Sequence, residues 1–272
     1  MELGMFTSGY QRYPLERAFA DARRLGYDYV ELWGGRPHAF APDLQRGGLA
    51  EVLSLEEKYQ MPVYVYTPEH NAYPYNYMSG SRLQWEDSME YLELCLEVGK
   101  ALGARYTLIS VGHGGNTAPR RELWTRLLES LRRLAGKAEA LGHKILLEGL
   151  TPYESNLCTT AGELAQVLDE VNSPCLLGMC DVVPPAAVRE PVTDYLDKLG
   201  TRMAHLHLVD SDGVSDTHLL PGDGLLPLPE LLRELQEQGY RGKATIELVT
   251  AYLAEPALYA RRALERVRAM GG

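Results

Sequence analysis

A regular alternation of short β-rich runs and longer amphipathic segments constrains the fold of this sequence more than any other feature. Each short run predicts a strand. In the segments between runs, apolar residues recur at spacings of three and four, which is typical of a helix that packs one face on a sheet. Such repeats predict parallel strands joined by right-handed crossovers. The expected strands are Glu2–Phe6, Tyr29–Trp33, Val63–Thr67, Tyr106–Ser110, Lys144–Glu148, Cys175–Asp181, Met203–Val209 and Ala244–Val249.

The segments between the expected strands predict the helices. Several of them end in a glycine just before the next strand, and glycine tolerates the left-handed conformation that closes a helix. Stretches rich in proline and glycine around residues 33–48, 68–80, 182–191 and 221–229 are interpreted as loops. The clearest expected helices are Leu15–Leu25, Leu83–Leu102, Glu122–Leu141, Ala161–Val171, Leu228–Gln238 and Pro256–Met270.

Eight strand-helix units predict an α/β fold closed into a single (β/α)8 TIM barrel. The length of 272 residues suits such a barrel, which typically needs about 250. The rival architecture is an open doubly wound sheet. No GxGxxG follows the first expected strand and no Walker-type phosphate loop is found, which disfavours that rival. We therefore expect one domain over residues 1–272.

Composition narrows the class of partner. The formal net charge is −10, which disfavours binding to a nucleic-acid backbone. The N-terminal segment does not resemble a signal peptide, and no stretch approaches the roughly 18 apolar residues of a membrane span. The four cysteines form no CxxC pair and are expected to be reduced. These features predict a cytoplasmic protein that binds no membrane.

Polar residues end four consecutive expected strands. They are Glu148, Asp181, His207 and Glu247. In a (β/α)8 barrel the carboxyl ends of the strands meet at one rim, where active sites lie. Three acids and an imidazole brought together there would repel and desolvate one another without a cation. The sequence therefore predicts one divalent metal ion, and this oxygen and nitrogen ligand set accepts Mn, Co, Ni, Mg or Zn.

Two histidines stand in the expected strand 203–209. We expect the side chains of His205 and His207 to point to opposite faces of that strand, so that only one can readily be a ligand. His207 is assigned as the ligand because it lies nearer the carboxyl end. His205 is then expected to be packed or to lie behind the metal ligands.

Five segments that span nearly the whole chain carry a family resemblance. The sequence resembles the xylose isomerase-like (sugar phosphate isomerase/epimerase) TIM-barrel superfamily and, within it, the fructoselysine 3-epimerase group. The segment WGGRPHAFAPDL is specific to the group, whereas the metal pattern alone indicates the wider superfamily. The segments are WGGRPHAFAPDL (33–44), YTPEHNAYPYN (66–76), LEGLTPYESN (147–156), HLHLVDSDGVSDTH (205–218) and IELVTAYLAEPALYARRALER (246–266).

The resemblance implies a mechanism. A single metal ion would be held by the four rim residues, and Glu148 and Glu247 would also exchange protons with opposite faces of a ketose. C3 would be inverted through a cis-enediolate, with fructoselysine and psicoselysine as the expected pair. Glu154 matches a position that contacts substrate in similar ketose 3-epimerases.

Two positions depart from the pattern of those ketose epimerases. Pro184 stands where they usually carry a histidine, and Gly213 stands where they carry an arginine. Both missing groups handle the C1–C2 end of a free ketose. Their absence disfavours an ordinary tagatose or psicose 3-epimerase and fits a substrate whose C1 bears an amine.

Further side chains are candidates for contact with substrate. Asp216 and His218 are similar to a zinc-binding D-x-H of the related AP endonucleases, and we interpret them as either loop-structuring or close to substrate. His113 lines the pocket or structures a turn. Aromatic residues near strand ends could pack on a sugar face or on the top of the barrel; they are Trp33, Phe6, Tyr66 and Tyr73.

Several functions remain as alternatives. The nearest is another ketose 3-epimerase or sugar isomerase of the same superfamily, such as a hydroxypyruvate or inosose-type enzyme. A metal-dependent phosphodiesterase similar to the AP endonucleases is disfavoured by Pro184 and by the acidic charge. A non-catalytic binding protein is disfavoured by the presence of both Glu148 and Glu247. Association into a homo-oligomer is also possible.

Overall fold

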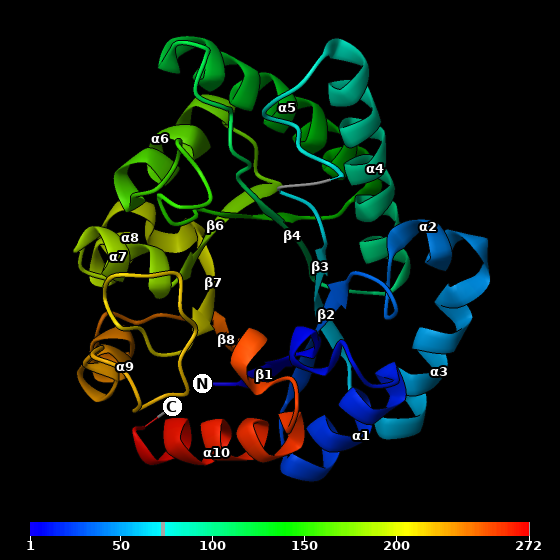
Figure 1. Cartoon of the computed structure of the whole chain (residues 1–272), viewed down its shortest axis with the longest axis vertical. Helices are drawn as coiled ribbons and strands as arrows, with labels where there is room; N and C mark the ends of the chain where they lie inside the picture. Colours follow the sequence, from blue (N-terminus) through cyan, green and yellow to red (C-terminus); the bar gives the residue numbers. More distant parts are fainter. Residues whose placement is uncertain (72–73, 272) are drawn as a thin grey trace.

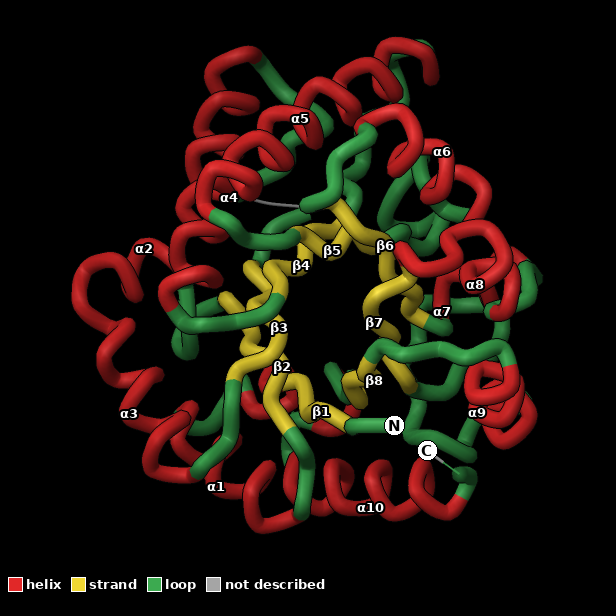
Figure 2. The backbone as a smooth tube through the Cα atoms, turned by 180° about the vertical axis from the view of Figure 1, so that it is seen from behind, coloured by secondary structure: helices red, strands yellow, loops and turns green. Residues whose placement is uncertain are grey.

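A computed structural model describes residues 1–71 and 74–271 of the chain. Its strands are all parallel and close into a barrel in sequence order, with β8 paired to β1. Figure 1 shows the helices as an outer ring, and Figure 2 shows the ring of strands from the opposite side. The predicted (β/α)8 fold is confirmed. The strands are β1 (Leu3–Phe6), β2 (Tyr29–Gly34), β3 (Val63–Pro68), β4 (Tyr106–Ser110), β5 (Ile145–Glu148), β6 (Leu176–Asp181), β7 (Met203–Leu208) and β8 (Lys243–Ile246).

The six predicted helices are present with small shifts at their ends. Four helices were not predicted: α3, α7, α8 and α2, the last of which has three residues. The α-helices are α1 (Leu15–Leu25), α2 (Ala41–Asp43), α3 (Leu49–Tyr59), α4 (Arg82–Ala101), α5 (Arg120–Leu141), α6 (Ala161–Val171), α7 (Val183–Val188), α8 (Thr193–Leu199), α9 (Leu228–Glu237) and α10 (Pro256–Ala269).

The interpretation of residues 33–48 and 182–191 as loops was wrong. The first stretch contains α2 and a π-helical turn at Leu44–Gly48, and the second contains α7. Prolines misled the interpretation, because Pro42, Pro184 and Pro185 lie at the start of short helices. Proline is tolerated there, since the first backbone N–H groups of a helix have no partner within it.

Apolar side chains fill two layers around the strands. The outer layer joins the strands to the helices and holds most of the buried core. A smaller cluster contains Leu146 and Met179. These two residues precede Glu148 and Asp181 by two positions and therefore lie on the same face of β5 and β6. Over residues 1–71 and 74–271, no helix is long and apolar enough to cross a membrane.

Candidate metal centre

Four strands deliver one polar side chain each to the same rim of the barrel. Glu148 is the last residue of β5, Asp181 is the last residue of β6, His207 is the penultimate residue of β7, and Glu247 directly follows β8. One carboxylate oxygen or ring nitrogen from each residue lies within 4.8 Å of the others. The structure thus brings together the four residues that were selected from the strand ends.

The His207 imidazole lies at the centre of this group. Its Nδ1 is 2.8 Å from Oε2 of Glu247 and 3.3 Å from Oε1 of Glu148. The ring is buried, yet Nδ1 forms no hydrogen bond of acceptable geometry with the residues that the structure describes. A buried ring nitrogen without a hydrogen-bond partner, surrounded by carboxylates, is a donor atom suited to a metal ion.

The electrostatics of the chain alone are those of crowded carboxylates. Burial raises the pKa of Glu148 to about 8, and the charges of Glu247 and Asp181 add to this effect. Burial also disfavours the charged form of Glu247, but His207 and His218 outweigh it and hold the pKa of Glu247 below its ordinary value. Burial disfavours protonation of His207, whereas Glu31 and Glu247 hold its pKa well above its ordinary value. The cluster therefore favours additional positive charge.

The donor set fits a divalent cation. Three carboxylates and one imidazole are ligands that Mn, Co, Ni, Mg and Zn accept. The nearby Cys180 thiol is not a competing ligand in this structure, because its Sγ donates to the carbonyl oxygen of Asp181, 3.2 Å away. Burial also raises the pKa of Cys180 well above its ordinary value, which keeps the thiol neutral. The cluster can hold a metal ion without a thiolate.

The loop after β7 adds His218 to the edge of the cluster. Its Nε2 is 3.1 Å from Oδ2 of Asp181 and 3.4 Å from Oε2 of Glu247. Glu154 lies in the loop after β5, where its Oε2 accepts a hydrogen bond from Thr151 at 3.1 Å. Burial raises the pKa of Glu154 to about 7, and the charge of Asp216 contributes. The two loops therefore carry further titratable groups beside the rim.

The remaining candidates for contact with substrate lie in different surroundings. Phe6 stacks on His207 with ring centroids 5.9 Å apart. Trp33 is half-buried, and its Nε1 donates to Glu69 at 2.6 Å. His113 accepts a hydrogen bond from the N–H of Gly115 through Nδ1, which is a contact within a turn.

The structure does not bring Tyr66 to the cluster. Its side chain is fully buried in the outer layer, and its hydroxyl donates to the carbonyl oxygen of Ala39 at 2.8 Å. Tyr66 was a candidate because it stands near the end of a strand, where an aromatic side chain can face either the barrel mouth or the surrounding helices. In the structure it faces the helices. Tyr73 lies outside the described residues.

The prediction that His205 and His207 point to opposite faces was wrong. Residues two apart in a strand share a face. Both rings contact the same side chain, Glu31, whose oxygens lie 3.2 Å and 3.0 Å from the two Nε2 atoms. Glu31 was missed in the sequence, where it is a single acid inside the apolar run of β2. The signal in the sequence was the charge itself, because a buried strand rarely carries an acid that has no partner.

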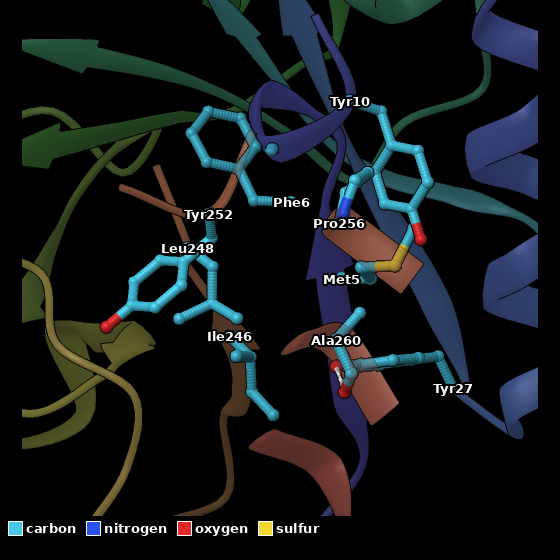
Figure 3. Close-up of a pocket in the computed structure, with 10 residues that line it drawn as sticks. Met5, Phe6, Tyr10, Tyr27, Ile246, Leu248, Tyr252, Pro256 and Ala260 are labelled. Carbon is cyan, nitrogen blue, oxygen red and sulfur yellow. Dashed lines mark hydrogen bonds between the residues drawn. The ribbon is translucent and has the colours of Figure 1, made fainter. Parts of the chain in front are cut away.

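A small cavity lies beside the barrel, between β1, the end of β8 and α10 (Figure 3). Its volume is about 10 Å³, roughly the space of one water molecule. The lining is mostly apolar, and its tyrosine hydroxyls are already used: Tyr10 bonds Asp21, Tyr27 bonds Ala260 and Tyr252 bonds Leu220. This cavity is a packing defect and is too small for a sugar.

Comparison with known proteins identifies a family and relatives of similar sequence. Residues 19–270 match the family model described as xylose isomerase-like TIM barrel. The fructoselysine 3-epimerase of Shigella flexneri is 51% identical over 270 residues, which cover 99% of this chain and 98% of that protein.

Solved structures share the fold at lower identity. The apo form of 3-keto-D-glucoside 4-epimerase from E. coli superposes with a TM-score of 0.84 at 17% identity, covering 99% of both chains. The IOLI protein, solved with a zinc atom, superposes with a TM-score of 0.81 at 18% identity, covering 100% of this chain and 96% of that one.

Proposed function

The chain belongs to the xylose isomerase-like TIM-barrel family, within its fructoselysine 3-epimerase group, and is an epimerase; from this premise we propose that it inverts C3 of a ketose-type sugar. Fructoselysine and psicoselysine are the proposed substrate pair. The support is the 51% identity to a fructoselysine 3-epimerase over 99% of the chain. A sugar is also small enough to enter the mouth of a barrel of this kind.

One observation carries the proposal: two glutamates from different strands converge on one imidazole. Glu148 comes from β5 and Glu247 follows β8, and both carboxylates lie within 3.3 Å of Nδ1 of His207. Inversion at a carbon needs one proton acceptor and one proton donor on opposite faces of the substrate. A single base that moves a proton between neighbouring carbons would suit aldose–ketose isomerisation instead.

We assign one divalent metal ion to Glu148, Asp181, His207 and Glu247. When bound, it would supply Lewis-acid polarisation of the carbonyl next to C3 and compensate the charge that develops in the transition state. In the proposed reaction one glutamate removes the C3 proton, which produces a cis-enediolate. The other glutamate then returns a proton to the opposite face, and the configuration at C3 is inverted.

The surroundings of two positions support a substrate modified at C1. Pro184 is buried at the start of α7, and Gly213 has a positive φ of 72°. Neither position presents a polar side chain for a free C1 hydroxyl. We therefore favour a C1-amino ketose over an ordinary ketose as substrate, and over the phosphodiester of the related nucleases.

The test is incubation of fructoselysine with the metal-loaded protein in D₂O. We expect psicoselysine to form and deuterium to appear at C3 of both sugars, as followed by NMR. Fructose, tagatose and an inosose serve as comparison substrates. The absence of both psicoselysine and C3 deuterium would remove this function, and faster conversion of a free ketose would transfer the proposal to that substrate.

A further inference from the structure

Glu31 is a fully buried carboxylate in the middle of β2, within the sequence YVELW. It has 0% exposure and lies in the barrel interior, across from β7. Its Oε1 is 3.0 Å from Nε2 of His207, and its Oε2 is 3.2 Å from Nε2 of His205. Burying a charged carboxylate costs free energy because water no longer solvates it. Hydrogen bonds from neighbouring side chains compensate that loss.

The chemistry of these contacts determines where the proton of His207 lies. An ionised carboxylate only accepts hydrogen bonds, so Nε2 of His207 must carry the hydrogen that it donates to Glu31. In the neutral ring the other nitrogen, Nδ1, then carries the lone pair. This nitrogen is the one that faces Glu148 and Glu247 and that has no aligned hydrogen bond.

A polar network across the barrel holds Glu31 in place. Thr67 of β3 donates to Oε1 of Glu31 at 2.6 Å. On the other side, Nε2 of His205 lies 2.9 Å from the hydroxyl of Thr245, which itself lies 3.2 Å from the hydroxyl of Tyr29. Side chains from β2, β3, β7 and β8 therefore share one network, and the Glu31 carboxylate has little freedom to turn away from His207.

We propose that Glu31 is a positioning residue that holds His207 in the tautomer and orientation needed to bind the metal ion through Nδ1. The inference rests on the proposed metal site. Outer carboxylates of this kind fix the ring and raise the basicity of a metal-binding imidazole, and their loss typically weakens metal binding about 10- to 100-fold. Of the four rim residues, Glu31 contacts His207.

A different reading of the same residues is a second ion between Glu31, His205 and His207, whose ligand atoms lie within 4.8 Å of one another. The structure favours the hydrogen-bonded network, because the facing Nε2 atoms and carboxylate oxygens are already paired at 3.0 Å and 3.2 Å. The number of ions bound per chain separates the two readings.

The experiment compares Mn²⁺ affinity and ion count for the wild type and Glu31→Gln. The matched control is Glu56→Gln, because Glu56 is a partly buried glutamate on α3 that accepts a hydrogen bond from the N–H of Val63, away from the site. We expect one ion per wild-type chain, a Kd raised about 10- to 100-fold in Glu31→Gln, and no change in the control. Thr67→Val, which removes one donor to Glu31, should raise the Kd by about 3- to 10-fold.

A second measurement reads the tautomer directly. In protein labelled with ¹⁵N-histidine and loaded with Zn²⁺, two-bond ¹H–¹⁵N correlations should show His207 protonated at Nε2, and Glu31→Gln should weaken or redistribute that signal.

Unchanged Kd and tautomer in Glu31→Gln would overturn the inference and leave the proposed function standing. Two ions per chain would overturn it as well, and a wild type that binds no divalent ion would overturn it together with the metal site. Metal binding that depends on Glu31 in a protein inactive on fructoselysine would support the inference and remove the proposed substrate.

Discussion

At the scale of single residues, the site gathers acids whose surroundings make them unequal. Burial and neighbouring acids favour the neutral form of Glu148, whereas His207 and His218 favour the ionised form of Glu247. The difference arises from position, because Glu247 has two imidazoles within 3.4 Å of one oxygen and Glu148 has one within 3.3 Å. Two residues of the same type can therefore have different roles at one rim.

Replacement of either rim glutamate should abolish inversion. We expect kcat on fructoselysine to fall by about 10²- to 10⁴-fold in Glu148→Gln and in Glu247→Gln, because each removes one of the two proposed proton-transfer groups. Deuterium exchange at C3 should vanish or persist from only one of the two epimers in each variant. Metal content is measured in parallel to separate loss of the ion from loss of the acid. Glu139→Gln, at an exposed position, is the control, and full activity in either rim variant would exclude that glutamate from the scheme.

Glu154 should make the protein less stable as the pH rises. Burial raises its pKa from the ordinary 4.5 to about 7, so the folded state favours the neutral acid. This contribution is fully present below pH 4.5 and is lost as the pH rises through about 7. The amide of Glu154→Gln cannot ionise. At pH 8 we therefore expect the unfolding free energy of this variant to exceed that of the wild type by up to about 3 kcal/mol, and near pH 4 we expect no difference. Urea denaturation of metal-free protein at both pH values measures this. A difference that does not change with pH, or the same trend in the exposed Glu57→Gln, would contradict the assignment.

At the scale of elements, the segment between β7 and α9 brings His218 to the rim residues Asp181 and Glu247. Its conformation depends on Asp210, which is buried and lies two residues after the end of β7. Oδ1 of Asp210 accepts the N–H groups of Ser211 and Leu226 at 2.9 Å and 3.0 Å, and Oδ2 accepts the N–H of Gly222 at 2.9 Å. One carboxylate therefore ties together the two ends of the loop, and His218 lies between them.

Asp210→Asn should loosen this loop. An amide has one oxygen, so its NH₂ would face a backbone donor, which costs about 1–3 kcal/mol at a buried position. We expect faster amide hydrogen exchange over residues 211–226 and lower epimerase activity, measured by mass spectrometry and by NMR. Asp212→Asn is the matched control, because the hydrogen bonds that Asp212 accepts come from neighbouring residues of the same loop, Val214 and Ser215. Unchanged exchange in Asp210→Asn would show that other contacts hold the loop.

At the scale of the whole molecule, closure of the barrel joins the two ends of the sequence. β1 pairs with β8, and α10 lies against α1, as the red and blue helices of Figure 1 show. The rim cluster follows from the same closure, because its four residues come from four neighbouring strands of one ring. Stability, metal binding and the active rim should therefore be coupled.

Metal binding should raise the stability of the whole chain. An ion that binds only the folded state at 100 times its Kd adds about 2.7 kcal/mol to the unfolding free energy. We expect the Tm to rise by several degrees on addition of Mn²⁺ and to return to its starting value on chelation, as measured by calorimetry. Asp181→Asn should lose most of this shift. An equal shift in that variant would indicate that the ion binds elsewhere.

The assignment of residues 1–272 to one domain stays a prediction, and calorimetry tests it too. Because the barrel needs both β1 and β8 to close, the metal-free protein should unfold in one transition whose calorimetric and van't Hoff enthalpies agree. Two resolved transitions would indicate separate units. Sedimentation of the same sample would test the possible homo-oligomer.

The sequence by itself determined the order of the strands, six of the helices and the selection of the four rim residues. These rest on local signals: periodicity distinguishes strand from helix, and the carboxyl end of a strand can be found from its neighbours. The prolines of α7 show where local signals mislead, because the same residue type begins helices and occupies loops.

Only the tertiary structure decided which further side chains contact the four rim residues. Glu31 lies 176 positions from His207 in the sequence, and His218 meets Asp181 across 37 positions. The sequence of β2 does not say whether its acid faces the helices or the interior, because both faces of a barrel strand are buried. Closure of the barrel decides it, since it sets the register of every strand and places the Glu31 carboxylate against both histidines of β7.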